Sequence, residues 1–244
     1  MTKRSLWLLP LAATLILTGC SGSDNADPVT TESSPAPSQK QDQTSGKSLS
    51  ADQVKDVVTK LVGEDSSAQI LDNEVMKPQL ENAKTMEGSN GIKPEECAKQ
   101  QEKYTVTDLT GTVAASATVQ GDSTGKVIQI FSITDAQTRK NISEALKLSD
   151  IEGCESISVS VSGQEVNTDR QILDLDSTAD QALTMATQMK VGADEYLNSV
   201  AVQALEGNSF VLVTFSSGTV EAPLLAGEAM KLADQAFAEI KSLQ

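Results

Sequence analysis

The sequence of 244 residues contains no histidine. This absence removes the commonest metal ligand and general base, and with it every Ser-His-Asp or Cys-His catalytic arrangement. Basic residues are also scarce, with 19 Lys and Arg against 34 Asp and Glu. Because proteins bind nucleic acid mainly through Lys and Arg contacts to phosphates, we expect no nucleic-acid partner.

Aromatic residues make up only 3% of the chain, which argues against stacking platforms for sugars or bases. Paired carboxylates can perform acid–base catalysis without histidine, but among 34 acidic residues any chosen pair is uninformative. No glycine-rich loop of the phosphate-binding kind is present. We therefore predict a protein that is not an enzyme, with no catalytic residues, no metal site and no cofactor.

The first 19 residues have the pattern of an export signal. Lys3 and Arg4 precede an apolar stretch that is too short for a comfortable membrane span, which needs about 20 apolar residues. The stretch ends in Leu-Thr-Gly-Cys, which resembles a bacterial lipobox with Cys20 as the lipidated residue. An ordinary signal peptide or a short anchor helix is the alternative. We predict a lipid-anchored protein on the extracytoplasmic side of the cell membrane, with 17 basic and 34 acidic residues after cleavage.

Residues 20–48 form a linker of low complexity after the predicted signal peptide. From Ser21 to Ser48 the chain has seven Ser, three Thr and three Pro, and Val29 is its only large aliphatic residue. Such a segment buries too little apolar surface to offset its chain entropy, so we expect disorder. As a flexible coil it would reach roughly 30 Å from the membrane.

The remaining residues, 49–244, are enough for one well-packed domain. Ser50 and Gln53 resemble a capping box before a helix that Gly63 ends. Pro94 begins a short helix carrying Cys97, and Asp135 caps another that runs to about Leu148. The chain ends in an amphipathic helix whose buried positions would be Leu225, Ala229, Leu232, Ala233, Ala236, Phe237, Ile240 and Leu243.

Strand patterns lie between these helices. The segments 112–120 and 126–133 predict a hairpin with a five-residue loop, 157–162 alternates strictly, and 200–205 with 210–215 predict a second hairpin. The segment 171–175 is a possible strand. The segment 182–191 is uncertain between helix and strand, and 70–86 is ambiguous because Pro78 limits any helix there.

Two units of paired strands followed by a helix predict an α+β domain, in which an antiparallel sheet is flanked by helices against one face. A weak internal duplication is possible, although no sequence identity supports it. The whole chain is then a signal peptide, a disordered tether and one α+β domain.

Cys97 and Cys154 remain once Cys20 carries a lipid. An exported protein lies in a compartment where thiols pair, so we expect a structural disulfide between them. A redox pair or metal ligands are the alternatives, although the chain has neither Cys-x-x-Cys nor histidine. Closing a loop of this length would stabilise the fold by about 4 kcal/mol in the chain-entropy model.

Two further motifs have a chemical interpretation and a simpler one. Gly121-Asp122-Ser123-Thr124-Gly125 matches the Gly-x-Ser-x-Gly of hydrolases, but it lies between two strands and has no histidine base, which favours a hairpin loop. Asp174, Asp176 and Asp180 are spaced like calcium ligands, but the Gly and Glu of an EF-hand loop are missing, which favours solvated acids.

The order of features from Ser50 onward resembles the PknH-like extracellular sensor domain of actinobacterial lipoproteins and a mycobacterial serine/threonine kinase. The residues that carry this resemblance are the helix at 54–61, Pro94-Glu95-Glu96-Cys97-Ala98, Val127-Ile128-Gln129-Ile130-Phe131, Ile151-Glu152-Gly153-Cys154, Val211-Leu212-Val213 and the final helix. It implies a mixed domain with a central antiparallel sheet and a broad cleft for an unidentified ligand. Cys97 and Cys154 are the only functional residues that it carries over, and the family's second cysteine pair is missing.

Three functions remain open from the sequence. The first is a non-enzymatic, membrane-tethered domain that binds or senses a small molecule, with unknown ligand-binding residues. The second is an envelope lipid carrier, which would need a large apolar cavity. The third is a surface module for protein interaction, whose negative charge would favour a basic partner.

Overall fold

The computed structural model describes residues 47–83, 91–106, 108–109, 111–121, 123–161, 164–192 and 195–244. The predicted signal peptide, Cys20 and nearly all of the predicted linker lie outside these residues. Five helices occur in the described part of the chain: α1 (Ala51–Val62), α2 (Asn73–Ala83), α3 (Glu95–Tyr104), α4 (Ala136–Ala145) and α5 (Ala222–Ser242). None of them combines the length and the apolar character that a membrane span requires.

Nine strands form one antiparallel sheet in the order β1-β3-β4-β9-β8-β7-β6-β5-β2. Their bounds are β1 (Gln69–Leu71), β2 (Ile92–Lys93), β3 (Thr112–Gln120), β4 (Thr124–Ile133), β5 (Ser156–Val161), β6 (Gln164–Leu173), β7 (Gln181–Lys190), β8 (Tyr196–Glu206) and β9 (Ser209–Ser217). The long central strands pair along nearly their whole length, whereas the edge strands β1 and β2 have three and two residues. The predicted α+β fold with a sheet flanked by helices is confirmed.

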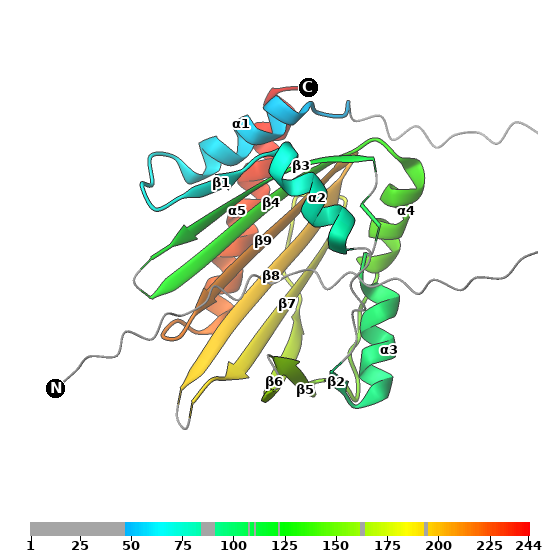
Figure 1. The fold of residues 1–244 in the computed structure, drawn as a ribbon, viewed down its shortest axis with the longest axis vertical. Coiled ribbons are helices and arrows are strands. Elements are labelled where there is room, and N and C mark those ends of the chain that lie inside the picture. The colour runs from blue at the N-terminus through cyan, green and yellow to red at the C-terminus, as the bar shows by residue number, and fades with distance from the viewer. Residues whose placement is uncertain are drawn as a thin grey trace, which may run out of the picture.

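Helices pack on both faces of this sheet, which corrects the expectation that they lie against one face. Ala114 and Ala115 are consecutive, so they point to opposite faces, and both are completely buried. On one side α1 and α5 form a core with β3, β4, β8 and β9. On the other side, α2 and α4 form a second core around Phe131 and Phe210. Figure 1 shows α5 behind the sheet and α2 in front of it.

Local chemistry explains where the helices begin and end. Ser50 and Gln53 form the predicted capping box, and the backbone of Gly63 ends α1 at φ 60°, a conformation that favours glycine. Asp135 accepts a hydrogen bond from the Thr138 amide at 2.7 Å and caps α4. Pro94 is the N-cap of α3, which carries Cys97 as predicted.

In α5, seven of the eight predicted positions are buried. Leu243 is half-buried and packs against the core beyond the end of the helix.

Three segments differ from the sequence prediction, and a fourth, which the sequence left uncertain, is a strand. Helix α2 runs through Pro78, which was expected to limit it, because a proline removes only one backbone hydrogen bond and the helix is held by Met76 in the second core. Strand β6 begins seven residues before the predicted 171–175, and the uncertain segment 182–191 is strand β7. Strand β4 begins at Thr124, two residues before the predicted start, so the loop of the first hairpin is shorter than predicted.

Candidate functional site

The disulfide joins Cys97 of α3 to Cys154, 57 residues later, as predicted. Both cysteines are buried, and they pack with Ile151 and Ile157 in a small third core. The bond therefore fastens α3 to the chain entering β5, at the end of the sheet farthest from α1. This placement favours the structural role over a redox pair or metal ligands.

Arg170 of β6 completes this region. Its side chain is only 8% exposed, and its Nε and Nη2 atoms donate to the Cys154 carbonyl at 3.1 and 2.8 Å. Its Nη1 atom donates to Gln101 of α3 at 2.9 Å. Burial lowers the pKa of Arg170, and the nearby Glu155 carboxylate opposes that shift. Since these bonds join three segments of the chain, Arg170 acts as a clamp on the disulfide region.

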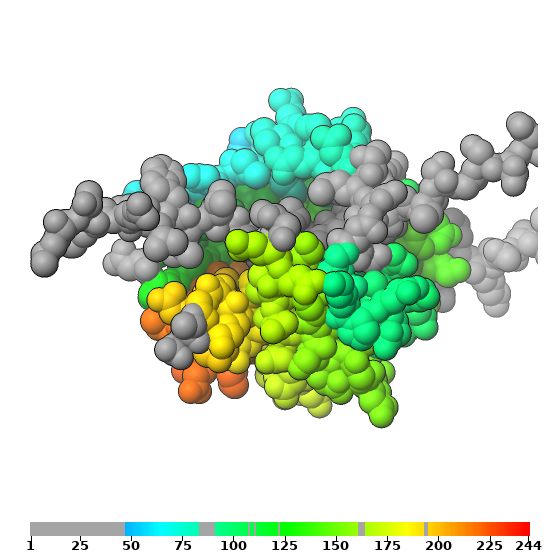
Figure 2. All heavy atoms as spheres, turned by 60° about the horizontal axis from the view of Figure 1, so that its bottom comes forward, coloured from blue at the N-terminus to red at the C-terminus, as the bar shows by residue number. Residues whose placement is uncertain are grey.

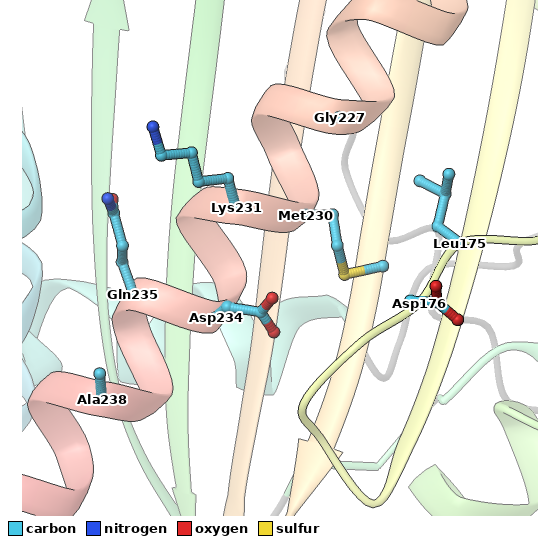
Figure 3. Close-up of a pocket in the computed structure, with 8 residues that line it drawn as sticks. All are labelled: Leu175, Asp176, Gly227, Met230, Lys231, Asp234, Gln235 and Ala238. Atoms are coloured by element: carbon cyan, nitrogen blue, oxygen red, sulfur yellow. The ribbon is translucent and has the colours of Figure 1, made fainter.

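A shallow groove of about 560 Å³ runs along the outer side of α5 (Figure 3). Its lining residues come from α5 and the loop after β6: Leu175, Asp176, Gly227, Met230, Lys231, Asp234, Gln235 and Ala238. The Asp234 carboxylate already accepts hydrogen bonds from the amide and hydroxyl of Thr178, at 3.1 and 2.8 Å. The groove is therefore mainly the seam where this loop is fastened to α5.

The predicted aspartate cluster lies beside this groove and in the same loop. Asp176 lines the groove, whereas Asp180 accepts a hydrogen bond from the Gly207 amide at 3.1 Å in the β8–β9 turn. Across the described residues, no three carboxylates or thiolates converge in a way that could hold a metal ion. The Asp174–Asp180 spacing thus reflects loop and turn contacts.

The Gly-x-Ser-x-Gly motif lies at the β3–β4 hairpin, where the loop interpretation placed it. The Gly121 amide donates to the Thr124 carbonyl at 2.9 Å, which closes the turn, and the Ser123 carbonyl accepts from the Ser217 hydroxyl. Thr124 and Gly125 already belong to β4, and Asp122 is outside the described residues. A serine at a hairpin between antiparallel strands is not on the strand-to-helix elbow that the hydrolase motif requires.

The side of the sheet opposite α5 contains a region with no charged side chain, here called the neutral face. The strand register places its members on adjacent strands: Thr118, Val127, Gln129, Met185, Thr187, Leu197, Ser199, Ala201, Gln203, Leu212, Thr214 and Ser216. Most of these side chains are half-buried. Helix α5 packs on the opposite side of β7, β8 and β9. On the side of the neutral face, α2 and α4 cover only one end of these strands, at Leu183, Leu205 and Phe210.

The neutral face lies between structures that stand above the sheet. Helix α2 contacts β1 and β3 at one end, and α3 lies beside β2 and α4 at the other. In the space-filling view, α2 (cyan) and α3 (blue-green) lie on different sides of the yellow-green part of the sheet (Figure 2). The strand surface is thus flanked by helices.

Polar groups on the neutral face are arranged in rows across the strands. Gln129, Leu212 and Gln203 are directly opposite one another on β4, β9 and β8. In a parallel row, Ser216, Ser199 and Thr187 are opposite one another on β9, β8 and β7. Within the described chain, none of these polar side chains has a hydrogen-bond partner. Their donors and acceptors are available to solvent or to a ligand.

Apart from Arg170, the charged residues of strands β3 to β9 point to the other side of the sheet. By strand alternation, Lys126, Glu165, Asp169, Lys190 and Glu206 are all on the α5 side. Arg170 is the one charged residue of strands β3 to β9 on the side of the neutral face, and it is buried against the Cys154 carbonyl. In a chain with net charge −15, this separation distinguishes the neutral face from the rest of the surface.

Sequence reasoning did not find the neutral face. Its residues come from five strands and become neighbours only through the register, which sequence patterns do not specify between distant strands. One signal was present: the segments 112–120, 196–205 and 209–217 contain no charged residue, although charged residues make up 22% of the chain.

Lipidation of Cys20 stays a prediction, because this residue lies outside the described part of the chain.

Comparison with known proteins gives no family assignment. No family model and no curated protein matches the sequence. Among solved structures, the extracellular domain of PknH from Mycobacterium tuberculosis matches with 10% identity and a TM-score of 0.48, over 80% of this chain and 98% of that one. An uncharacterised protein from Mycobacterium smegmatis, an Rv0999 ortholog, matches with 14% identity and a TM-score of 0.46, over 78% and 97%. At these values the function of the chain has to be inferred from its own residues.

Proposed function

We propose that this protein is a membrane-tethered, extracytoplasmic domain that binds a ligand on the neutral face and acts as a sensor-like module, not as an enzyme. The observation that carries the proposal is a flanked sheet surface on which Gln129, Gln203, Ser199, Ser216 and Thr187 have no side-chain hydrogen-bond partner among the described residues. Binding sites typically combine apolar contact area with a few polar groups that fix orientation. The neutral face offers both, with the half-buried Met185 and Leu197 beside Gln203 and Ser199.

The anchor in this proposal is a lipid on Cys20, followed by the polar linker. One acyl chain binds a membrane only marginally, so firm attachment requires more than one chain. The test is Cys20→Ser in the native host, with fractionation of membranes from supernatant. We expect the variant to leave the mature membrane-bound pool, and retention at the wild-type level would refute the lipid anchor.

A carrier function is less well supported than a binding function. A carrier needs an enclosed apolar cavity, but the apolar strand positions on the α5 side are filled by packed side chains of α1 and α5. On the other side, Phe131 and Phe210 are completely packed beneath α2 and α4. On the remaining sheet surface most side chains are half-buried and Leu212 and Thr214 are buried, so it offers a surface for reversible binding and not an enclosed cavity.

The binding test uses thermal unfolding of the purified full chain against a panel of envelope glycans, lipids and cations. We expect at least one ligand to raise the melting temperature, because a ligand that binds only the folded state stabilises it. Ala201 is half-buried at the centre of the neutral face, so Ala201→Trp should remove the response by filling this surface. Ala238→Trp, at an exposed position on α5, is the matched control. Equal responses in the two variants, or no response to the panel, would contradict the proposal.

A further inference from the structure

We infer that the ligand of the neutral face is uncharged and rich in hydroxyl groups, as a neutral oligosaccharide is, either free or as the head group of a glycolipid. The inference rests on the proposed function and adds the chemical class of the ligand. It follows from three observations. Charged side chains are absent from the neutral face, its polar groups are amides and hydroxyls, and these groups are side chains on a sheet face and not backbone groups at a strand edge.

The charge distribution selects against ionic ligands. An anionic ligand would approach a protein of net charge −15 and would find no accessible cation on the neutral face, since Arg170 is buried and bonded to the Cys154 carbonyl. A cationic ligand would be attracted to the protein, but to its carboxylates, which lie elsewhere on the surface. An uncharged ligand gains no electrostatic attraction from the acidic surface, so the neutral face favours it over charged ligands.

The polar groups of the neutral face match hydroxyl chemistry. Ser199, Ser216 and Thr187 each offer one donor and acceptor oxygen, and Gln129 and Gln203 each offer an amide donor and a carbonyl acceptor. A ligand hydroxyl also donates and accepts, so it can pair at any of these positions. The groups extend over β4, β9, β8 and β7, which at the usual strand separation is about 14 Å. This length fits an elongated ligand of a few sugar units lying across the strands.

The apolar residues of the face supply contact to the C–H surfaces of such a ligand. Met185 lies next to Ala201, and Val127 and Leu197 are half-buried on β4 and β8. None of the twelve residues that define the face is aromatic, so strong stacking is missing and we expect an affinity in the micromolar to millimolar range. A peptide is a poorer candidate, because extended peptides are usually recognised by hydrogen bonds at a strand edge.

The experiment measures binding to the purified full chain by titration calorimetry. The probes are uncharged glucan, galactan, mannan and arabinan oligosaccharides, each compared with a carboxylated and an amine-bearing oligomer of similar length. Phosphatidylcholine vesicles with and without a digalactosyl lipid separate a free glycan from a glycolipid head group. We expect at least one uncharged probe, in solution or on the vesicle, to bind at least about tenfold more tightly than its charged counterparts.

Two substitutions of equal charge test the site. Gln203→Glu places a carboxylate on the neutral face, and Gln171→Glu places one at an exposed position on the other side of the same sheet. We expect the first to weaken binding of the uncharged probe about tenfold or more and the second to leave it within about twofold. Ser199→Asp repeats the test should Gln203→Glu lower the melting temperature.

Three results would overturn the inference: no binding of any uncharged probe, equal or tighter binding of a charged oligomer, or equal losses in the Gln203 and Gln171 variants. A charged ligand, a neutral peptide or an apolar lipid that binds and is lost in Ala201→Trp would leave the proposed binding function standing and refute only the ligand class. If no ligand gives a response that depends on Ala201, both the proposed binding function and the inferred ligand class are refuted.

Discussion

Reduction of the Cys97–Cys154 disulfide should destabilise the domain strongly. The two cysteines are 57 residues apart. Closing a loop of this size lowers the entropy of the unfolded chain, which adds about 4 kcal/mol to the free energy of unfolding in the chain-entropy model. In a domain of this size, each kcal/mol corresponds to a shift of about 2–4 °C in melting temperature, so we expect a decrease of about 8–16 °C.

The assays are thermal unfolding for the melting temperature and urea unfolding for the free energy, each of the full chain, followed by circular dichroism, with and without a thiol reductant. Reduction changes no side-chain volume apart from the bond itself, which makes it cleaner than substitution. Cys97→Ala with Cys154→Ala provides the control, since reductant should no longer affect the stability of that variant. A loss below about 1 kcal/mol on reduction would refute the reasoning, because it would mean that the reduced unfolded chain is already restricted or that the bond strains the fold.

Three other substitutions test the packing, the clamp and a helix cap. Phe131→Ala should lower the free energy of unfolding by about 3–5 kcal/mol, because Phe131 is completely buried against Phe210, with ring centroids 5.6 Å apart. Urea unfolding measures this loss, and a value under about 1 kcal/mol would contradict the packing of the second core. Arg170→Gln should cost about 1–3 kcal/mol in the same assay, because it leaves the buried Cys154 carbonyl without its donors, and an unchanged stability would refute the clamp. Asp135→Ala should destabilise the protein at neutral pH, and the difference from wild type should shrink in acid. Hydrogen bonds from Thr138 lower the pKa of Asp135 from its ordinary value, so its contribution to stability is present above the unfolded pKa and lost as the pH falls through the folded pKa. Urea unfolding at pH 7 and near pH 3 measures this, and a difference that does not depend on pH would contradict the cap.

The sequence predicted those elements whose signals are local. The alternation at 157–161, the cap at Ser50 and the apolar stripe of α5 each lie within one element, and the structure contains all three. The first half of β6 was missed because Gln164–Arg170 is mostly polar, with its side chains at sheet positions that alternate between exposed and buried. Strand β7 was uncertain because its alanines, threonines and methionines fit either a helix or a strand.

Long-range features could not be predicted in the same way. In the structure, Ala114 and Ala115 are both buried because helices cover both faces of the sheet. Alanines in a sequence do not reveal this, since a small residue fits an exposed face as well as a covered one. The two hairpin-and-helix units in fact place α4 and α5 on opposite sides of the sheet. The neutral face depends on the register of β7, β8, β9 and β4, whose members are up to about a hundred residues apart.

The most direct test of the central claim is to observe the side chains of the neutral face while a ligand binds. Side-chain amide resonances of Gln129 and Gln203 report on this surface, and those of Gln171 and Gln235 report on the other side of the sheet and on the α5 groove. On addition of the uncharged oligosaccharides to the isotopically labelled full chain, we expect the first pair to shift and the second pair to stay. Shifts confined to Gln235 and its neighbours, or no shift at Gln129 and Gln203, would contradict the account.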